Sequence, residues 1–187
     1  DVIYDIETFP NCFTFYAIHA LTKREWCFEI SNYINQTSLL VCFLQRLSKF
    51  NCRMVGFNNL NFDYPVIHFI LLNKKLCTPE MIHAKASSII NSVDRNFTHV
   101  IWDNQRLIPQ LDLFKIHHFD NFARSTSLKV LEFNMRSNSI QELPFKPDTS
   151  LDKNKIKILK RYNRYDVLQT LNFYLRSIDK IKFREEL

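Results

Sequence analysis

Glycine is almost absent from this sequence of 187 residues, which contains it only at position 56. Phosphate-binding loops of the GxGxxG and Walker types need several glycines at fixed spacing, because their backbone must approach the phosphates closely. The sequence therefore excludes both kinds of nucleotide-binding loop. Gly56 itself becomes informative, since a glycine at the end of a strand permits close approach of backbone or ligand.

Cysteine patterns that bind zinc are also missing. The chain has an odd number of cysteines, without a CxxC pair and without zinc-finger spacing to a histidine: Cys12, Cys27, Cys42, Cys52 and Cys77. This usage indicates reduced side chains in a protein that is not secreted. No stretch approaches the ~18 apolar residues of a membrane span. We therefore expect a cytoplasmic protein without a membrane segment.

Basic residues outnumber acidic ones by 25 to 19, which gives a net charge of +6. Such an excess favours a polyanionic partner through the field of the whole protein. Hydrophobic residues make up 46% of the chain and include 17 phenylalanines, so a sizeable core is available. We expect one globular domain.

The first residues bring two acids together. The stretch Val2-Ile3-Tyr4-Asp5-Ile6-Glu7-Thr8 is an apolar run that contains Asp5 and Glu7. Residues i and i+2 of a strand point to the same face, so the two carboxylates share a face while Ile6 points into the core. Carboxylates so placed repel each other unless a cation lies between them. The pattern predicts half of a divalent metal site.

The patterns that follow predict a mixed sheet with helices on its faces. Alternating residues indicate strands over 1–7, 13–19 and 26–30, joined as an antiparallel meander. A helix capped by Thr37 or Ser38 comes next, then a short buried strand over 53–57 and a helix that begins at Pro65. One α/β domain whose sheet also has parallel strands accounts for this order.

The second half of the chain has weaker patterns until its end. We expect a helix over 79–91, a hairpin with strands over 97–102 and 105–113, and a short helix over 127–133. Residues 149–152 have the spacing of a capping box and begin a long helix that runs to about residue 180. Its later apolar residues are spaced 4,3,4,3 and define a buried stripe: Val167, Leu171, Tyr174, Ile178 and Ile181.

Two further acids have competing interpretations. Asp63 lies where a strand leads into a helix, so it is either the N-cap of that helix or a metal ligand. Asp166 lies four residues after Tyr162, which places the two side chains on one helical face. It is either part of the same site or a salt-bridge partner on a mostly basic helix.

The order and spacing of these residues resemble the three exonuclease motifs of the DEDD superfamily. The matched segments are Asp5-Ile6-Glu7, Asn59-Leu60-Asn61-Phe62-Asp63 and Tyr162-Asn163-Arg164-Tyr165-Asp166. A tyrosine four residues before the last Asp is typical of the DEDDy branch of DnaQ-like 3′→5′ exonucleases. The sister branch has histidine five residues before it, where this chain has Arg161. The Asn-x-x-Phe-Asp form is similar to the exonuclease domains of family B DNA polymerases, especially protein-primed phage and viral ones.

This resemblance implies a ribonuclease H-like fold and hydrolysis of DNA from its 3′ end with two divalent ions, Mg²⁺ or Mn²⁺. It implies that Asp5, Glu7 and Asp166 hold the ion that generates hydroxide. Asp5 bridges to the second ion, on which Asp63 acts through water. Tyr162 orients the attacking water, because a phenol of pKa ~10 is a poor base at neutral pH.

The resemblance also implies substrate contacts. Asn59 and Phe62 fall on positions that contact the terminal nucleotides, Asn59 by hydrogen bonds and Phe62 by stacking. Core packing is the alternative for Phe62. Lys129 belongs to a segment similar to one in the same polymerases and is a candidate for phosphate contact. Lys155 and Lys160 are candidates too, with a solvated basic face as the alternative.

The chain begins at Asp1 and ends within a helical pattern, so we expect residues 1–187 to be one exonuclease domain from a longer protein. A polymerase domain in the same chain is an expected partner. The expected partner is the 3′ end of a single strand, DNA before RNA, in bacterial, phage or viral replication or on an organellar plasmid. Two alternatives stay open. One is an exoribonuclease or standalone exonuclease of the superfamily, and the other is an inert nucleic-acid-binding module. Residues 75–110 have no assigned role.

Overall fold

A central β-sheet organises the molecule. The computed structural model describes residues 1–92, 99–118, 127–130 and 141–186. Within them the sheet has five strands in the order β3-β2-β1-β4-β5. Their bounds are Val2–Phe9 for β1, Cys12–His19 for β2, Glu25–Ser31 for β3, Met54–Gly56 for β4 and Gln110–Asp112 for β5.

The pairing of the strands is mixed. β1 pairs antiparallel with β2, and β2 pairs antiparallel with β3. β4 lies parallel to β1, with Met54 opposite Val2, and β5 lies parallel to β4. This confirms the predicted α/β class, in which an antiparallel meander continues into parallel strands. Parallel neighbours need a crossover connection, and α2 and α3 supply it between β4 and β5.

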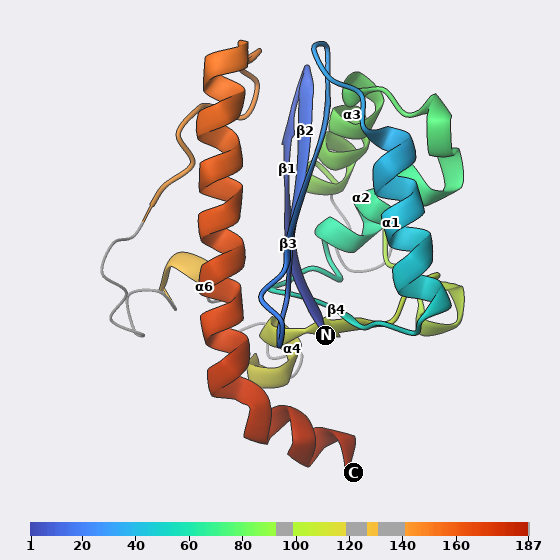
Figure 1. The fold of residues 1–187 in the computed structure, drawn as a ribbon, viewed down its shortest axis with the longest axis vertical. Helices are drawn as coiled ribbons and strands as arrows, with labels where there is room; N and C mark the ends of the chain where they lie inside the picture. Colours follow the sequence, from blue (N-terminus) through green and yellow to red (C-terminus); the bar gives the residue numbers. More distant parts are fainter. Residues whose placement is uncertain (93–98, 119–126, 131–140, 187) are drawn as a thin grey trace.

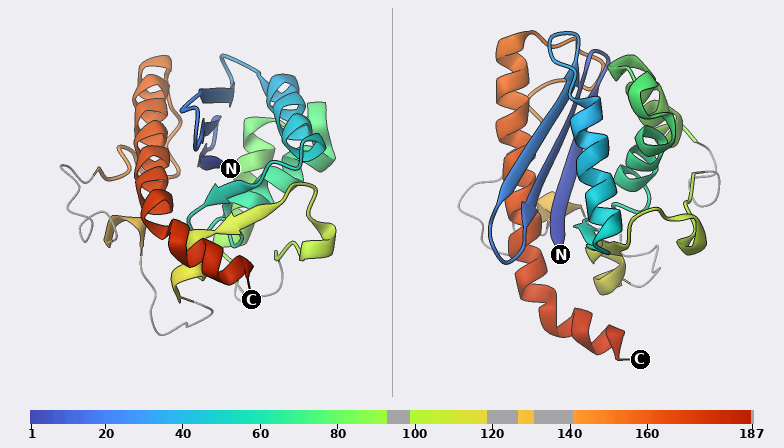
Figure 2. Two further views of the ribbon diagram at one scale, coloured as in Figure 1. Left: turned by 60° about the horizontal axis from the view of Figure 1, so that its bottom comes forward. Right: turned by 45° about the vertical axis from the view of Figure 1, so that its right-hand side comes forward.

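Helices cover both faces of the sheet (Figure 1). On one face lie α1 (Thr37–Lys49), α2 (Asp63–Asn73) and α3 (Pro79–Ile90). On the other face α6 (Lys153–Glu185) runs along the strands, and the short α4 (Leu113–His118) packs beside it (Figure 2). Two 3-10 turns, η1 (Lys74–Leu76) and η2 (Asp103–Gln105), connect elements. None of the described helices is long and apolar enough to cross a lipid bilayer.

The predicted hairpin in the middle of the chain is wrong for the residues that are described. Residues 99–102 form no strand, η2 occupies 103–105, and β5 begins only at Gln110 and pairs in parallel with β4. An Asp-Asn pair favours tight turns of several kinds, and here it begins a 3-10 turn. The helix predicted over 79–91 is confirmed as α3. Of the helix predicted over 127–133, residues 127–130 are described, and 128–130 are helical.

Helix starts differ from the predictions by one to three residues. Asp152, the last residue of the predicted capping box, is itself the N-cap of α6 and accepts hydrogen bonds from the backbone N–H groups of Asn154 and Lys155. α2 begins at Asp63, two residues before Pro65. Because its N-cap is Phe62 and makes no side-chain capping bond, the N-cap interpretation of Asp63 is wrong.

The two faces of β1 meet different surroundings. Val2, Tyr4 and Ile6 belong to the large apolar core beneath α1, α2 and α3. Ile3, on the opposite face, packs in a smaller cluster with α6. This confirms the predicted stripe on that helix for Val167, Leu171, Tyr174 and Ile181, while Ile178 is not part of the cluster. Asp5 and Glu7 continue the face of Ile3, so the sheet directs both carboxylates toward α6.

Candidate metal centre

Three carboxylates converge between β1 and α6. Asp5, Glu7 and Asp166 each place a carboxylate oxygen within 4.8 Å of the corresponding oxygens of the other two. The strand brings the first two together because residues i and i+2 share a face. The long helix, packed on the same face, adds the third from more than 150 residues away. The structure therefore joins three of the four acids that the sequence singled out.

Mutual repulsion and burial disfavour the charged forms of these acids. Burial raises the pKa of Asp5 well above its usual range, and the nearby charges of Asp63 and Glu7 raise it further. The pKa of Glu7 rises for the same reasons, with Asp166 as its strongest neighbour. Carboxylates that are held close together against their own repulsion have an evident counterion in a divalent cation, which prefers oxygen ligands.

Lys129 supplies part of the missing positive charge. Its Nζ lies 2.8 Å from Oδ1 of Asp166, and 4.9 Å and 5.8 Å from the ring centroids of Tyr162 and Tyr165. Burial raises the pKa of Asp166, while this ammonium opposes the shift. The sequence predicted a phosphate contact for Lys129. The structure places the side chain against the carboxylate cluster, where it can meet either a ligating acid or a bound phosphate.

Tyr162 lies at the edge of the cluster, one helical turn before Asp166. The phenol is buried, and its pKa is raised by that burial and by the charges of Asp166 and Glu7. Its hydroxyl hydrogen-bonds Asp166 and keeps its proton at neutral pH. With its one O–H donated to Asp166, the phenol oxygen can still accept a hydrogen bond from a water, but the protonated phenol is not a base.

Asn163 is a member of the site that sequence reasoning missed. The side chain is completely buried, and its Nδ2 donates to Oδ2 of Asp5 over 2.7 Å. Thr14 on β2 donates from Oγ1 to the amide oxygen of Asn163 over 3.3 Å. This chain of hydrogen bonds fixes the orientation of Asp5. An asparagine in mid-helix, three residues before Asp166 and on the same face, was the available signal.

Asp63 lies near the cluster without joining it. It is the first residue of α2 and is only 7% exposed. Burial raises the pKa of Asp63 to about 7, and its charge in turn raises the pKa of Asp5 and Glu7. Its oxygens are not part of the group that lies within 4.8 Å. A role through water, as the sequence implied, fits this more distant position.

The loop before Asp63 is fixed by an acid that the sequence analysis did not select. Oδ1 of Asp112, at the end of β5, accepts the backbone N–H of Asn58 at 2.8 Å and of Phe114 at 2.9 Å. Its Oδ2 accepts the N–H of Leu60 at 3.3 Å. Asn58 has a φ of 58°, a left-handed conformation that asparagine tolerates. Asp112 therefore holds the turn that delivers Asp63, and only the position of β5 beside β4 reveals this.

The buried side chain of Asn59 accounts for the glycine at position 56. Asn59 is fully buried, and its Nδ2 donates to Gln110 at 3.0 Å and to the hydroxyl of Tyr4 at 3.3 Å. A Cβ added at Gly56 would lie 2.6 Å from the Cβ of Asn59. The glycine is thus required by a side chain of the same loop. A nucleotide contact by Asn59 stays a prediction, since a substrate would have to reach a buried amide.

Three further predicted substrate contacts have partners within the fold: Phe62, Lys155 and Lys160. Phe62 is partly buried and packs against the large core, so core packing accounts for part of its surface. Lys160 forms an ion pair with the buried Glu29. Lys155 lies over the ring of Phe145, with 6.0 Å between its Nζ and the ring centroid.

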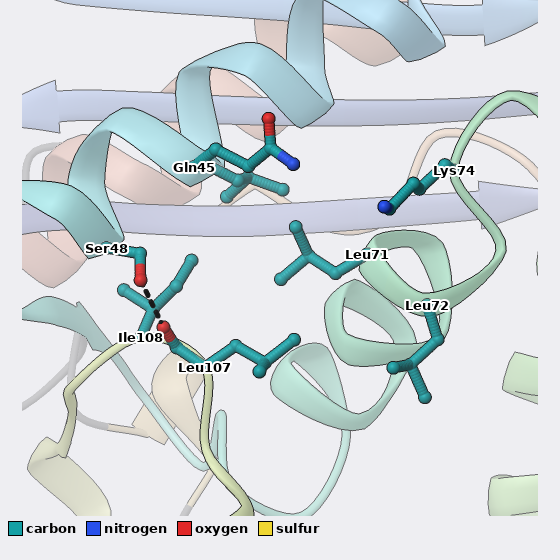
Figure 3. A pocket seen from close by; sticks show the side chains of 8 residues that line it. Gln45, Ser48, Leu71, Leu72, Lys74, Leu107 and Ile108 are labelled. Carbon is teal, nitrogen blue, oxygen red and sulfur yellow. Dashed lines mark hydrogen bonds between the residues drawn. The ribbon is translucent and has the colours of Figure 1, made fainter.

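A cavity of about 410 Å³ lies away from the carboxylates, between α1, α2 and residues 107–108 (Figure 3). Figure 3 shows Leu71, Leu72, Leu107 and Ile108 along its walls, with Ser48 Oγ donating to the carbonyl of Leu107. The lining contains no acid, histidine or cysteine. Lys74 is the one charged side chain of this lining, which thus offers no metal ligands and no pair of acid–base groups, and the functional candidate is the carboxylate cluster.

Comparison with known proteins agrees with this fold. No protein-family model and no curated protein sequence matches the chain. Among solved structures, the chain is similar to the family B DNA polymerase from the hyperthermophilic archaeon Pyrobaculum calidifontis. The TM-score is 0.54 over 95% of this chain, at 17% sequence identity. The chain spans 24% of the length of that polymerase. At this identity the similarity shows a shared fold.

Proposed function

We propose that this chain is a metal-dependent 3′→5′ exonuclease that hydrolyses single-stranded DNA ends, as the proofreading domain of a DNA polymerase. One observation carries the proposal: Asp5, Glu7 and Asp166 converge within 4.8 Å, with the phenol of Tyr162 beside them. These are the acids and the tyrosine of the DEDDy pattern, in the expected order. Residues 1–187 would form one exonuclease domain of a longer protein that also contains a polymerase domain.

The likeness to a family B DNA polymerase supports this context. It covers nearly all of the chain but about a quarter of the polymerase, as one domain of a larger enzyme would. Replication would place the protein where the DNA is copied, in the cytoplasm of a bacterium or of an infected cell, or in an organelle that holds a plasmid.

The donor set fits Mg²⁺ or Mn²⁺, because it offers only oxygen ligands that carry negative charge. Asp5, Glu7 and Asp166 would hold one ion, and Asp5 with the more distant Asp63 would hold a second. When bound, the two ions lower the pKa of the attacking water and stabilise charge on the leaving oxygen.

The residues around the acids have separate tasks. Tyr162 would orient the attacking water by accepting a hydrogen bond at its phenol oxygen, since the protonated hydroxyl donates to Asp166. Asn163 would hold Asp5 in the rotamer that faces the other acids. Lys129 would offset negative charge at Asp166 and could pass to a substrate phosphate. Asn59 and Phe62 stay predicted contacts to the terminal nucleotides.

Digestion of a 5′-labelled single-stranded oligonucleotide tests the proposal. Wild-type protein should produce a ladder that shortens from the 3′ end with Mg²⁺ or Mn²⁺ and stops with EDTA. Asp5→Asn should abolish the ladder. Asp179→Asn, which changes an exposed acid elsewhere on α6, should retain it.

Three outcomes would redirect the proposal. A ladder that survives Asp5→Asn would show that the site is elsewhere. Faster digestion of a matched RNA than of DNA would favour the exoribonuclease. Tight binding without cleavage under either metal would favour an inert nucleic-acid-binding module.

A further inference from the structure

The first half of α6 carries an unusual run of positive charge. Residues 153–165 contain six basic residues and no acidic one; the basic residues are Lys153, Lys155, Lys157, Lys160, Arg161 and Arg164. The second half of the same helix mixes both signs, with Asp166, Asp179 and Glu185 among its basic residues. The excess of positive charge on α6 is therefore confined to its first half.

Structural partners account for only part of this charge. Lys160 pairs with buried Glu29, and Arg164 with Glu25 at 2.7 Å, so both tie α6 to β3. Lys153 lies over the ring of Tyr33 at 5.4 Å from its centroid. Lys157 and Arg161 are exposed, and neither makes an ion pair with any residue of the described part of the chain.

These cations also work against the helix that carries them. The N-terminal end of a helix is the positive end of its dipole, so basic residues in the first turn destabilise it and acidic residues are favoured there. The first turn of α6 has no acid, and it contains Lys153 and Lys155. The carboxylate of the N-cap Asp152 offsets part of this unfavourable charge. The exposed cations that remain without an acid are candidates for a functional use.

The exposed cations form a row that leads to the carboxylate cluster. Lys153, Lys157 and Arg161 are spaced by four residues, or about 6 Å along the helix. The same row continues to Tyr165, whose ring lies 5.8 Å from Nζ of Lys129, and Lys129 contacts Asp166. Cations at regular spacing along a surface suit the regularly spaced phosphates of a nucleic-acid backbone.

We propose that Lys153, Lys157 and Arg161 bind successive phosphates of a single nucleic-acid strand and direct its 3′ end toward Asp5, Glu7 and Asp166. The destination of the strand rests on the proposed function, whereas the binding surface does not. Tyr33, which is 47% exposed beside Lys153, adds a ring on which a base can stack. The shared chemistry is the phosphodiester backbone, so both DNA and RNA strands are suitable ligands.

Binding in EDTA tests the proposal, because it separates affinity from cleavage. Fluorescence anisotropy is measured with labelled DNA and RNA oligonucleotides of about 12 nucleotides. The variant is Lys153→Gln/Lys157→Gln/Arg161→Gln. The control, Arg46→Gln/Lys49→Gln/Lys182→Gln, removes the same charge from α1, on the other face of the sheet, and from the far end of α6.

The variant should bind on the order of tenfold more weakly than wild type at low salt. The slope of log K against log[salt] should fall by about 2, since each phosphate contact of a single strand contributes about 0.7. The control should stay within about twofold of wild type. Equal losses of affinity in both triple variants would show that only net charge matters and would overturn the proposal. An unchanged salt slope in the variant, or a wild-type protein that binds neither DNA nor RNA, would also overturn it.

Digestion distinguishes this proposal from the proposed activity. If the wild-type protein binds through Lys153, Lys157 and Arg161 but shows no metal-dependent cleavage, these residues keep their role in strand binding and the exonuclease proposal is refuted. If the Lys153→Gln/Lys157→Gln/Arg161→Gln variant instead cleaves the substrate of about 12 nucleotides with an unchanged KM, the exonuclease proposal stands and the binding role of the three cations is refuted. Thermal unfolding of both triple variants verifies that either result comes from folded protein.

Discussion

The two faces of the sheet use the same strands for different purposes. The face beneath α1, α2 and α3 is a continuous apolar core. The face beneath α6 has two smaller apolar clusters, and between them lies a polar layer with Asp5, Glu7 and Asp166. Apolar packing at both ends of α6 holds acids together that would otherwise repel each other. Stability is concentrated on one face, and charge that is unfavourable for folding is concentrated on the other.

Two carboxylates beneath α6, the half-buried Glu7 and the buried Glu29, give the sharpest contrast. Glu7→Gln should lower cleavage by more than about 10³-fold, beyond the 10²–10³ that a single electrostatic donor typically contributes, because it removes a charge from the cluster. Glu29→Gln should retain activity but lower the free energy of unfolding by about 1–3 kcal/mol, because it leaves Lys160 without its acid. Cleavage rates and urea unfolding of both variants measure the two effects. Similar activity losses in both would remove the distinction.

A core substitution on the other face should lower stability and leave cleavage nearly unchanged. Leu40 on α1 is fully buried, so Leu40→Ala should lower the free energy of unfolding by about 2–5 kcal/mol through lost burial and a cavity. Cleavage well below the unfolding temperature should stay near wild type. Gln45→Ala, on the same helix but exposed, is the control. An activity loss larger than about tenfold in folded Leu40→Ala would show that the faces are not independent.

Asn163→Leu should act on metal binding more than on folding. Removing the hydrogen bond to Asp5 should raise the metal concentration for half-maximal cleavage about 10–100-fold, as loss of a partner that orients a ligand commonly does. Thr14→Val, which removes only the more distant bond to Asn163, should have a smaller effect in the same direction. Metal titrations at saturating substrate measure both. An unchanged metal requirement in folded Asn163→Leu would reduce Asn163 to a packing role.

The smallest expected effect is a pH dependence of stability without metal. The folded state raises the pKa of Asp5, Glu7 and Asp166 above their ordinary values, and that of Asp63 to about 7. It therefore binds more protons than the unfolded chain between about pH 4 and pH 7, so stability is greatest below this window and falls as pH rises through it. In EDTA the unfolding temperature should fall by a few degrees from pH 5 to pH 7. Saturating Mg²⁺ or Mn²⁺ should reduce this fall, and an unfolding temperature that rises with pH in EDTA would contradict the assignment.

The sequence predicted those parts of the site that depend on local periodicity. Asp5 and Glu7 share a face because strands alternate, and Asp166 faces the sheet because the apolar stripe of α6 fixes its rotation. The resemblance of the three segments to exonuclease motifs then implied that the acids meet. No distance or partner was needed for these predictions.

The parts that were missed depend on contacts between distant segments. Thr14 and Asn163 are 149 residues apart, and Asp112 holds a turn 54 residues away from it. Nothing in their own neighbourhoods marks them, because an Asn in a helix and an Asp after a strand are common. The hairpin failed for a similar reason. Asp103 and Asn104 favour a turn, but only the pairing of β5 with β4 decides which strand follows it.

The contact between Gly56 and Asn59 has a consequence for related sequences. Since a Cβ at position 56 would lie 2.6 Å from the Cβ of residue 59, the two positions cannot both carry a side chain in this backbone. Descendants of a common ancestor should therefore covary here: a relative that gains alanine at position 56 should have lost the side chain at position 59. Such a pair of exchanges would leave room for the turn while removing the buried amide, and its occurrence would show that the hydrogen bonds of Asn59 to Tyr4 and Gln110 are dispensable.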